Sequence, residues 1–338
     1  MNQSNKHEGN FTISRTRELH KLLAEEGADH SRNISFVHLV NPVEKPPEHE
    51  LSRAQAVTYK SMRSAASFAM AQDPFLQVQL AATAFPEDAP AHPEGFIVLP
   101  PLERASEDVA SFRVPRRLPL LHEVLEKGAA CCEAADLPGD TYLVFTNIDI
   151  GVMPHFYAYC AWLVRHDFDT VIINRRTIAD FYPQSESDWP AMLSDFGGNH
   201  PGLDCFVIKA SILKKLSSFQ SIIGMGYVMR ALLYDLVANS SRATIILDAH
   251  ATFHVGDAMD WVSEKFNDYR EFNKAECLKT IAALIAQSPA LEARLANVAC
   301  LISDIFWMPA GTLNLTFQDR NPTVLIGLKR FAKTLLRR

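Results

Sequence analysis

Several features that would place a protein in a familiar class are missing from this sequence. It has six cysteines but no Cys-x-x-Cys pair, so we interpret them as reduced, mostly buried side chains and not as zinc ligands. No window of about 18 uncharged apolar residues is present, which argues against a transmembrane helix. The polar N-terminus also lacks the apolar core of a signal peptide. We therefore expect a cytoplasmic protein.

The short motifs of common enzyme classes are missing too. The chain contains no G-x-S-x-G turn, no G-x-x-x-x-G-K-[ST] loop, no H-E-x-x-H helix and no G-x-G-x-x-G after a strand. These absences weigh against hydrolases, P-loop NTPases and dehydrogenases. The formal net charge of -6 argues against a nucleic-acid partner, because the phosphate backbone attracts basic proteins.

What is present is the pattern of an α/β protein. Hydrophobic residues make up 48% of the 338 residues and charged residues 21%, which is enough apolar surface for a large core. Apolar runs alternate with helical periodicity, which predicts a doubly wound, mostly parallel sheet with flanking helices. Strands are expected over 34–40, 76–83, 95–102, 141–146 and 170–178, and helices over 15–26, 52–71, 118–135 and 154–166.

The second half of the chain follows a looser pattern. We expect strands at 205–210 and within 242–257, a helix over 226–240, and a helical hairpin over 273–307 that breaks at Ser288-Pro289. A basic amphipathic helix over 321–338 ends the chain. These features predict three parts: a polar N-terminal extension (1–32), a catalytic α/β domain (33–260) and a C-terminal helical extension (261–338).

Two polar residues follow the apolar strand at 141–146. They are Asn147 and Asp149, in the stretch "TNIDIG". In an open α/β sheet, ligands bind beyond the carboxyl ends of the strands, and a carboxylate with an amide suits a hard divalent cation that bridges phosphates. The alternative is that Asp149 caps the next helix while Asn147 satisfies loop backbone.

The order of these segments resembles a known family. A strand ending on Asn41-Pro42 is followed by a helix, a second strand, a charged loop, the basic segment "RVPRRLP" with a helix, and the strand that ends in Asn147-Ile148-Asp149. Over roughly residues 33–257 this is similar to GT-A-fold nucleotide-sugar glycosyltransferases, the family-2-like group in particular. The resemblance implies a nucleotide-sugar half over 33–150 and an acceptor half over 151–260.

The resemblance also implies a metal and a diphosphate site. Members of the family carry Asp-x-Asp at this strand end, which holds a divalent cation, Mn or Mg, and the diphosphate of the donor. Here Asn147 replaces the first Asp, and the loss of one carboxylate weakens cation binding. Asp149 and His254 are the implied metal ligands, with His250 the next candidate. The alternative for this pair of histidines is one satisfied buried side chain and one on the surface.

A sugar transfer that inverts the anomeric centre needs a base for the acceptor hydroxyl. The family places an acidic motif at the start of a later helix, but the corresponding segment, 223–232, has no acid. Asp204, directly before an apolar strand, is the best substitute, with His200 as the second candidate. A retaining mechanism needs no such base, and Asp204 can also be read as the cap of a turn.

Further candidates for donor binding lie at other strand ends. Arg117, Arg175 and Arg176 carry guanidinium groups that match phosphate oxygens. Asn41 and Glu44 follow the first strand of the domain, where the resemblance implies contacts with the nucleobase and ribose. For each arginine, simple surface solvation is the alternative.

Together these features predict a hexosyltransferase-type glycosyltransferase that moves a sugar from a nucleotide-diphosphate sugar to a hydroxyl of a glycan, lipid or protein. Two alternatives remain: a nucleotidyltransferase on a similar sheet, and a non-catalytic scaffold that kept the fold. The basic helix over 321–338 predicts that the protein contacts the anionic inner face of a membrane. A tail docked on the protein with a solvated basic face is the other reading.

Overall fold

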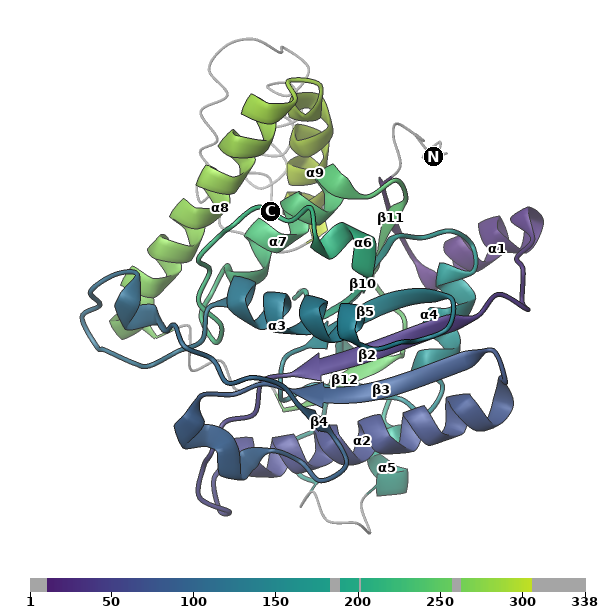
Figure 1. Cartoon of the computed structure of the whole chain (residues 1–338), viewed down its shortest axis with the longest axis horizontal. Helices are drawn as coiled ribbons and strands as arrows, with labels where there is room; N and C mark the ends of the chain where they lie inside the picture. Colours follow the sequence, from purple (N-terminus) through teal and green to yellow (C-terminus); the bar gives the residue numbers. More distant parts are fainter. Residues whose placement is uncertain (1–10, 183–188, 201, 257–262, 306–338) are drawn as a thin grey trace, which may run out of the picture.

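The computed structural model describes residues 11–182, 189–200, 202–256 and 263–305, which form an α/β sandwich (Figure 1). Its main sheet has the strand order β1-β11-β7-β10-β5-β2-β3-β4. Among these described strands, β10 alone is antiparallel to its neighbours. The predicted doubly wound, mostly parallel sheet is therefore confirmed. The strands are β1 (Phe11–Ser14), β2 (Ile34–Val40), β3 (Leu76–Ala82), β4 (Ile97–Val98), β5 (Asp140–Thr146), β7 (Thr170–Ile173), β10 (Cys205–Lys209) and β11 (Ala243–Ile246).

A second, smaller sheet corrects one expectation. The single strand predicted over 170–178 is divided at Asn174-Arg175, where the buried apolar run of β7 ends. The residues after this break leave the main sheet and join the small one, whose strand order is β6-β12-β8-β9. Its strands are β6 (Gly151–Val152), β8 (Arg176–Ile178), β9 (Gly198–Asn199) and β12 (Thr252–Val255).

Helices cover both faces of the main sheet. Helices α2 and α4 contribute to the hydrophobic cluster on one face, while α3, α6 and α7 contribute to the cluster on the other. The predicted helical hairpin is confirmed as α8 and α9, which pack on α7 and are separated at Ser288-Pro289. The helices are α1 (Thr16–Glu26), α2 (Glu50–Gln72), α3 (Leu121–Ala134), α4 (Phe156–Val164), α5 (Trp189–Ser194), α6 (Ala210–Leu213), α7 (Val228–Asn239), α8 (Asn267–Gln287) and α9 (Leu291–Ile305).

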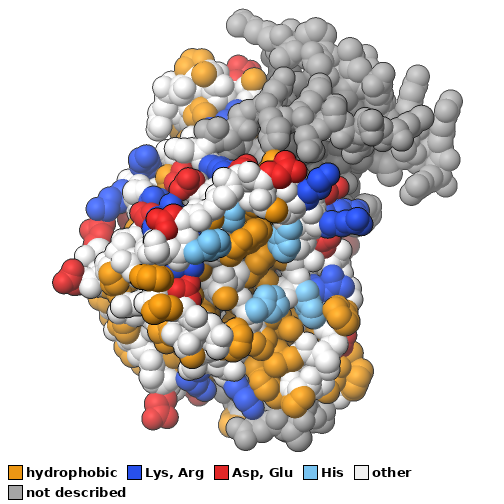
Figure 2. All heavy atoms as spheres, turned by 90° about the vertical axis from the view of Figure 1, so that its right-hand side faces the viewer, with side chains coloured by type: hydrophobic (Ala, Val, Ile, Leu, Met, Phe, Trp, Pro, Cys, Tyr) orange, Lys and Arg blue, Asp and Glu red, His pale blue; other side chains and the backbone are white. Residues whose placement is uncertain are grey.

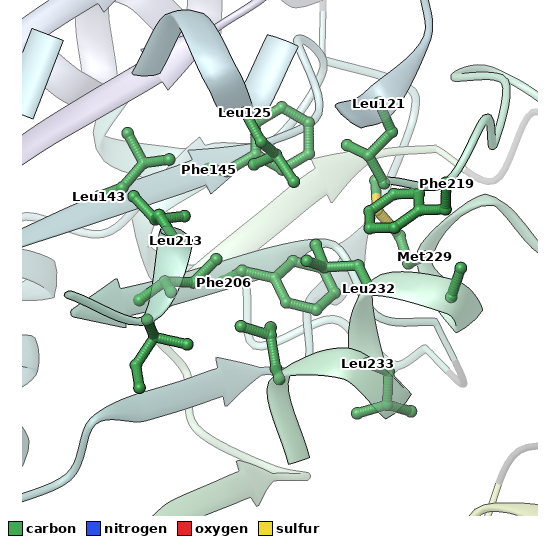
Figure 3. Packing of buried hydrophobic residues seen from close by; sticks show 14 of the residues in the cluster. Leu121, Leu125, Leu143, Phe145, Phe206, Leu213, Phe219, Met229, Leu232 and Leu233 are labelled. Carbon is green, nitrogen blue, oxygen red and sulfur yellow. The ribbon is translucent and has the colours of Figure 1, made fainter. Parts of the chain in front are cut away.

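Strand β5 shows why its sequence is a continuous apolar run. Leu143 and Phe145 belong to the core on the α3 face, where Leu121 and Leu125 project toward the sheet (Figure 3). Tyr142 and Val144 belong to the core on the α2 and α4 face. Successive side chains of a strand point to opposite faces, so a strand covered on both sides is apolar throughout.

The segment expected to be a polar extension contains one strand of the main sheet. Strand β1 pairs in parallel with β11, with Phe11 opposite Ala243, and the Thr12 Oγ1 donates to Thr244 Oγ1. A strand of four residues with only two apolar side chains carries too short a pattern to be recognised from sequence. None of the described helices is long and apolar enough to span a membrane. The basic segment 321–338 lies outside the described residues, so its membrane contact stays a prediction.

Gly128 of α3 faces the main sheet at a point where the helix packs tightly against it. A Cβ at this position would lie 2.8 Å from both Leu143 Cδ1 and Leu39 Cδ2. The Gly128→Val substitution is expected to lower the free energy of unfolding by about 1–3 kcal/mol through overpacking, measured by urea denaturation.

The matched control is Ala130→Val on the exposed side of the same helix. It is expected to cost no more than about 0.7 kcal/mol, the range of ordinary helix propensities. Equal losses in the two variants would contradict the close packing of α3 on β2 and β5.

Candidate functional site

The chain leaves β5 in a turn that places Asp149 against the small sheet. The Ile150 N–H donates to the Asn147 carbonyl at 3.2 Å, and the chain then enters β6. There Gly151 pairs with Phe253 of β12, and a Cβ at Gly151 would lie 2.4 Å from the Phe253 ring. Only glycine allows the two strands to approach this closely, and their pairing brings Asp149 beside His254.

His254, which is buried, forms an ion pair with Asp149, whose side chain is 30% exposed. Its Nε2 lies 3.2 Å from Asp149 Oδ2, and its Nδ1 lies 2.7 Å from the Gly256 carbonyl oxygen. A carbonyl oxygen only accepts, so Nδ1 carries a proton, and Nε2 must carry one as well to face a carboxylate. His254 is therefore an imidazolium in this arrangement.

The pKa values of the pair agree with that assignment. Burial by itself would lower the pKa of His254, but the hydrogen bond to Asp149 and the charge of Asp149 raise it above the ordinary 6.5. Burial by itself would raise the pKa of Asp149, but the hydrogen bond from His254 and the charges of His254 and Arg175 bring it below the ordinary 3.8. Each partner thus favours the charged form of the other.

A second group of side chains joins Asn147 to Arg175. The Asn147 Nδ2 donates to Asp204 Oδ1 at 3.2 Å, and Arg175 Nη1 lies 3.5 Å from Asp204 Oδ2. The Arg175 Nη2 donates to His200 Nδ1 at 3.4 Å. Because β10 is antiparallel to β5 and β7, its first residues lie at the same edge of the sheet as the last residues of those strands. We call Asn147, Asp149, Arg175, His200, Asp204 and His254 the polar cluster.

Several oxygen atoms in and around the polar cluster are buried without a hydrogen-bond partner. In the polar cluster they are Asn147 Oδ1, Asp149 Oδ1 and Asp204 Oδ2, and the adjoining residue Asn174 adds its Oδ1. Buried polar atoms in folded proteins are nearly always satisfied by protein, water, an ion or a ligand. Their concentration at the carboxyl edge of the sheet indicates a site for a polar ligand.

Some atoms of the polar cluster could coordinate a hard divalent cation, and others could not. The carboxylate oxygen of Asp149 and the amide oxygen of Asn147 are of the type that Mg²⁺ accepts when it takes its other ligands from substrate phosphates and water. His254 offers no lone pair in this arrangement, because both of its nitrogens donate. Within the part of the chain that the structure describes, no group of three or more His, Cys, Asp or Glu side chains is placed to hold a metal ion.

Four of the predicted binding residues make other contacts. Asn41 is buried and its Nδ2 donates to the Thr83 carbonyl, which ties the end of β2 to the end of β3. Glu44 is exposed, and its backbone N–H donates to Asp88 Oδ1. Neither contact involves the polar cluster.

Arg117 and Arg176, the other two of these four residues, make their contacts outside the polar cluster. Arg117 forms ion pairs with Glu87 at 2.7 Å and Glu107 at 2.9 Å. Arg176 points its guanidinium at the segment 196–199, which ends in β9, and donates to the Phe196 and Gly197 carbonyls and to Asn199 Oδ1. Arg176 therefore holds the segment that precedes His200.

Sequence reasoning missed Asn174 and Thr177. Asn174 had a usable signal, since it is the first polar residue after the apolar run of β7. Thr177 Oγ1 is buried without a hydrogen-bond partner, and Thr177 lies opposite His254 in the pairing of β8 with β12. No local pattern in the sequence reveals a pairing between strands that are so far apart in the chain.

Histidines are not restricted to the polar cluster. Figure 2 shows several of them among hydrophobic side chains on one face of the molecule. His20 of α1 packs edge-on against Trp162 of α4 with ring centroids 4.8 Å apart, and burial lowers its pKa. Histidine content therefore does not identify the site, whereas the contacts of Asp149 and Asp204 do.

Two hollows in the surface lie elsewhere. One of about 300 Å³ is bordered by Ser217 and Glu276, and one of about 290 Å³ by His122 and Glu123. Neither is lined by a member of the polar cluster. We place the candidate site at the polar cluster, because buried polar atoms without partners indicate ligand chemistry more directly than the size of a hollow does.

No protein-family model matches the chain, and no curated protein sequence matches it. Among solved structures, S. aureus TarS 1-349 in complex with UDP-GlcNAc is similar with a TM-score of 0.42 and 8% identity, over 82% of each chain. The same protein in complex with UDP gives a TM-score of 0.39 and 9% identity, over 87% of this chain and 86% of that one. Likeness at this level does not establish a shared activity.

The charge state of His254 can be measured directly. Its pKa, followed by NMR of the imidazole, is expected to lie above 6.5 in the wild-type protein and to drop below 6.5 in Asp149→Asn, where burial acts without the carboxylate. A wild-type value at or below that of a free histidine would contradict the ion pair.

The same proton makes stability depend on pH. Between 6.5 and its raised folded pKa, His254 is protonated in the folded chain and neutral in the unfolded one. Its contribution to the free energy of unfolding is therefore complete below 6.5 and is lost as pH rises through the folded pKa. Urea unfolding between about pH 5 and 8 is expected to show this decrease in the wild type and not in His254→Gln. Parallel curves would contradict it.

Proposed function

We propose that this protein is a glycosyltransferase that moves a sugar from a nucleotide-diphosphate sugar to a hydroxyl acceptor. The observation that carries the proposal is the polar cluster, in which Asn147, Asp149, Arg175 and Asp204 meet at the carboxyl edge of the sheet with buried oxygens left without hydrogen bonds. This edge is where open α/β sheets bind nucleotides.

The charges of the polar cluster suit a diphosphate that arrives with a cation. Asp149 is paired with the imidazolium of His254, and Asp204 with Arg175, so the cluster is close to neutral before a ligand binds. A diphosphate adds negative charge that needs compensation in a buried site. A divalent cation held by Asp149 and Asn147 would supply that compensation and stabilise the departing diphosphate, with Arg175 as a fixed positive charge beside it.

The acceptor side of the reaction needs a group that removes the hydroxyl proton. Asp204 is our candidate base, and His200 is the alternative, since both contact Arg175. The nucleobase and ribose would bind near Asn41 and Glu44, where the structure ties the ends of β2 and β3 together through Asn41 and Thr83. Arg176 would act through the segment 196–199, and Arg117 is the weakest of the phosphate candidates because Glu87 and Glu107 already neutralise it.

Donor binding is the direct test. Isothermal titration with UDP-, GDP- and CMP-sugars is expected to show that one of them binds, and binds more tightly with Mn²⁺ or Mg²⁺ present. Asp149→Asn is expected to weaken this binding about tenfold to 100-fold, the effect of a lost contact to a charged group.

The matched control is Asp136→Asn, which removes the same charge from an exposed residue before the start of β5, at the opposite edge of the sheet. Its donor affinity is expected to equal that of the wild type. A folded wild-type protein that binds none of the three nucleotide sugars would sink the proposal. Consumption of a nucleoside triphosphate with a sugar phosphate would favour a nucleotidyltransferase instead.

A further inference from the structure

Side chains with flat rings, several of them histidines, form a continuous surface beside the polar cluster. Phe196 is 72% exposed, and its ring centroid lies 5.1 Å from that of His250. The Met153 N–H donates to the Ala251 carbonyl at 2.9 Å, and this contact brings the start of α4 beside His250. The next ring is that of His155, which directly precedes α4.

The surface continues along α4 to α1. Rings recur at positions 155, 159 and 162, which is the spacing of one helix face. The Tyr159 ring centroid lies 6.5 Å from that of His155 and 6.0 Å from that of Trp162. His20 of α1 packs on both Tyr159 and Trp162, with ring centroids 5.6 Å and 4.8 Å apart. We call this set of side chains the aromatic stripe: Phe196, His250, His155, Tyr159, Trp162 and His20.

The aromatic stripe lies on an open face of the molecule. His20 and His155 are exposed, and the remaining rings besides Phe196 are partly exposed. Helices α1 and α4 lie on the side of Figure 1 that faces the viewer in Figure 2, where histidines appear among hydrophobic side chains. Packing of α1 on α4 accounts for the contact of His20 with Trp162. It does not account for Phe196, which belongs to another segment and is largely exposed.

The rings of the aromatic stripe are uncharged near neutral pH. Burial lowers the pKa of His20 below 6.5, against the charge of Asp248. Burial lowers the pKa of His155 as well, against a hydrogen bond with the His250 backbone. Burial and the charge of Arg176 lower the pKa of His250. Each neutral imidazole offers one donor and one acceptor, and the tyrosine and tryptophan add an O–H and an N–H. The stripe thus combines flat apolar faces and hydrogen-bonding groups with no charge.

This combination matches an uncharged glycan. A sugar ring has apolar C–H faces and a rim of hydroxyl groups, and its polarised C–H bonds are attracted to the negative face of an aromatic ring. The hydroxyl rim can pair with the imidazoles and with the polar ends of the tyrosine and tryptophan. An anionic membrane surface is instead recognised by clustered basic side chains, and the stripe has none among its rings.

Arg176 joins the aromatic stripe to the polar cluster. It follows Arg175 directly, and its guanidinium donates to the carbonyls of Phe196 and Gly197. We propose that the aromatic stripe binds the acceptor, and that the acceptor is an uncharged glycan chain that lies along α4 with its reacting end at the polar cluster. This inference rests on the proposed glycosyltransferase function and narrows its acceptor to a glycan.

The length of the aromatic stripe favours a chain of several sugar units. A helix rises about 1.5 Å per residue, so His155 and Trp162 lie about 10 Å apart along α4. Phe196 and His250 extend the surface beyond His155. Longer chains are therefore expected to bind more tightly, because each added unit covers a further ring.

The test compares glycan binding with donor binding in the full-length protein. An array of uncharged oligosaccharides of glucose, mannose, galactose and N-acetylglucosamine, in increasing chain lengths, identifies the glycan that binds most tightly. Titration calorimetry then gives its affinity for the wild type, Phe196→Ala, Trp162→Ala and His155→Ala. The matched control is Phe68→Ala, at a phenylalanine of α2 that is 45% exposed and lies outside the stripe. Affinity for the nucleotide sugar and melting temperature are measured for each protein.

The expected result separates the acceptor from the donor. The wild type is expected to bind an array glycan, and to bind it more tightly as the chain lengthens. Phe196→Ala and Trp162→Ala are each expected to weaken this binding about tenfold, the effect of one lost aromatic contact. His155→Ala should weaken it too, and keeps the test valid should Trp162→Ala fail to fold. All variants should bind the nucleotide sugar as the wild type does, and Phe68→Ala should match the wild type in both affinities.

Other outcomes overturn the proposal in distinguishable ways. A wild-type protein that binds the nucleotide sugar and none of the array glycans would refute this inference and leave the proposed function standing. Unchanged glycan affinity in all three stripe variants would place the acceptor elsewhere. A dimer in sedimentation velocity that the stripe variants dissociate would assign the surface to a second copy of the chain.

Two further results would also count against it. Binding to vesicles of phosphatidylcholine and phosphatidylglycerol that is lost in the stripe variants would assign the surface to a membrane. Failure of the wild type to bind any nucleotide sugar would instead refute the proposed function, and with it the acceptor role of the stripe.

Discussion

The site depends on one constraint, which is that buried charges need partners. Asp204 is buried at the edge of the sheet and Asp149 is partly buried beside it, so a carboxylate without a partner would be costly there. His254 and Arg175 compensate them, at 3.2 Å and 3.5 Å. The elements that carry these four residues meet at one place: the turn after β5, the break between β7 and β8, the start of β10 and strand β12.

The antiparallel strand β10 is what makes this arrangement possible. In a fully parallel sheet, the residue before a strand lies at the edge opposite the one where ligands bind. Because β10 runs against β5 and β7, Asp204 lies at the carboxyl edge of those strands, directly opposite Asn147. The small sheet completes the site, since β12 brings His254 to Asp149 only through its pairing with β6.

Gly151 shapes this edge of the sheet because it has no side chain. A Cβ at Gly151 would lie 2.4 Å from the Phe253 ring, so glycine allows β6 to pair closely with β12. Asp149, two residues before Gly151, thereby lies beside His254 of β12.

The sequence by itself determined the local elements and the first candidates. The spacing and length of the apolar runs predicted β2, β3, β5, the helices that flank them and the α8–α9 hairpin. Such patterns are visible in the sequence because they reflect burial along a single chain segment. The position after β5 likewise singled out Asn147 and Asp149. Only the tertiary structure decided which distant residues meet them. The division of 170–178 between two sheets and the protonated state of His254 depend on contacts between segments far apart in the chain, and no local pattern encodes such contacts.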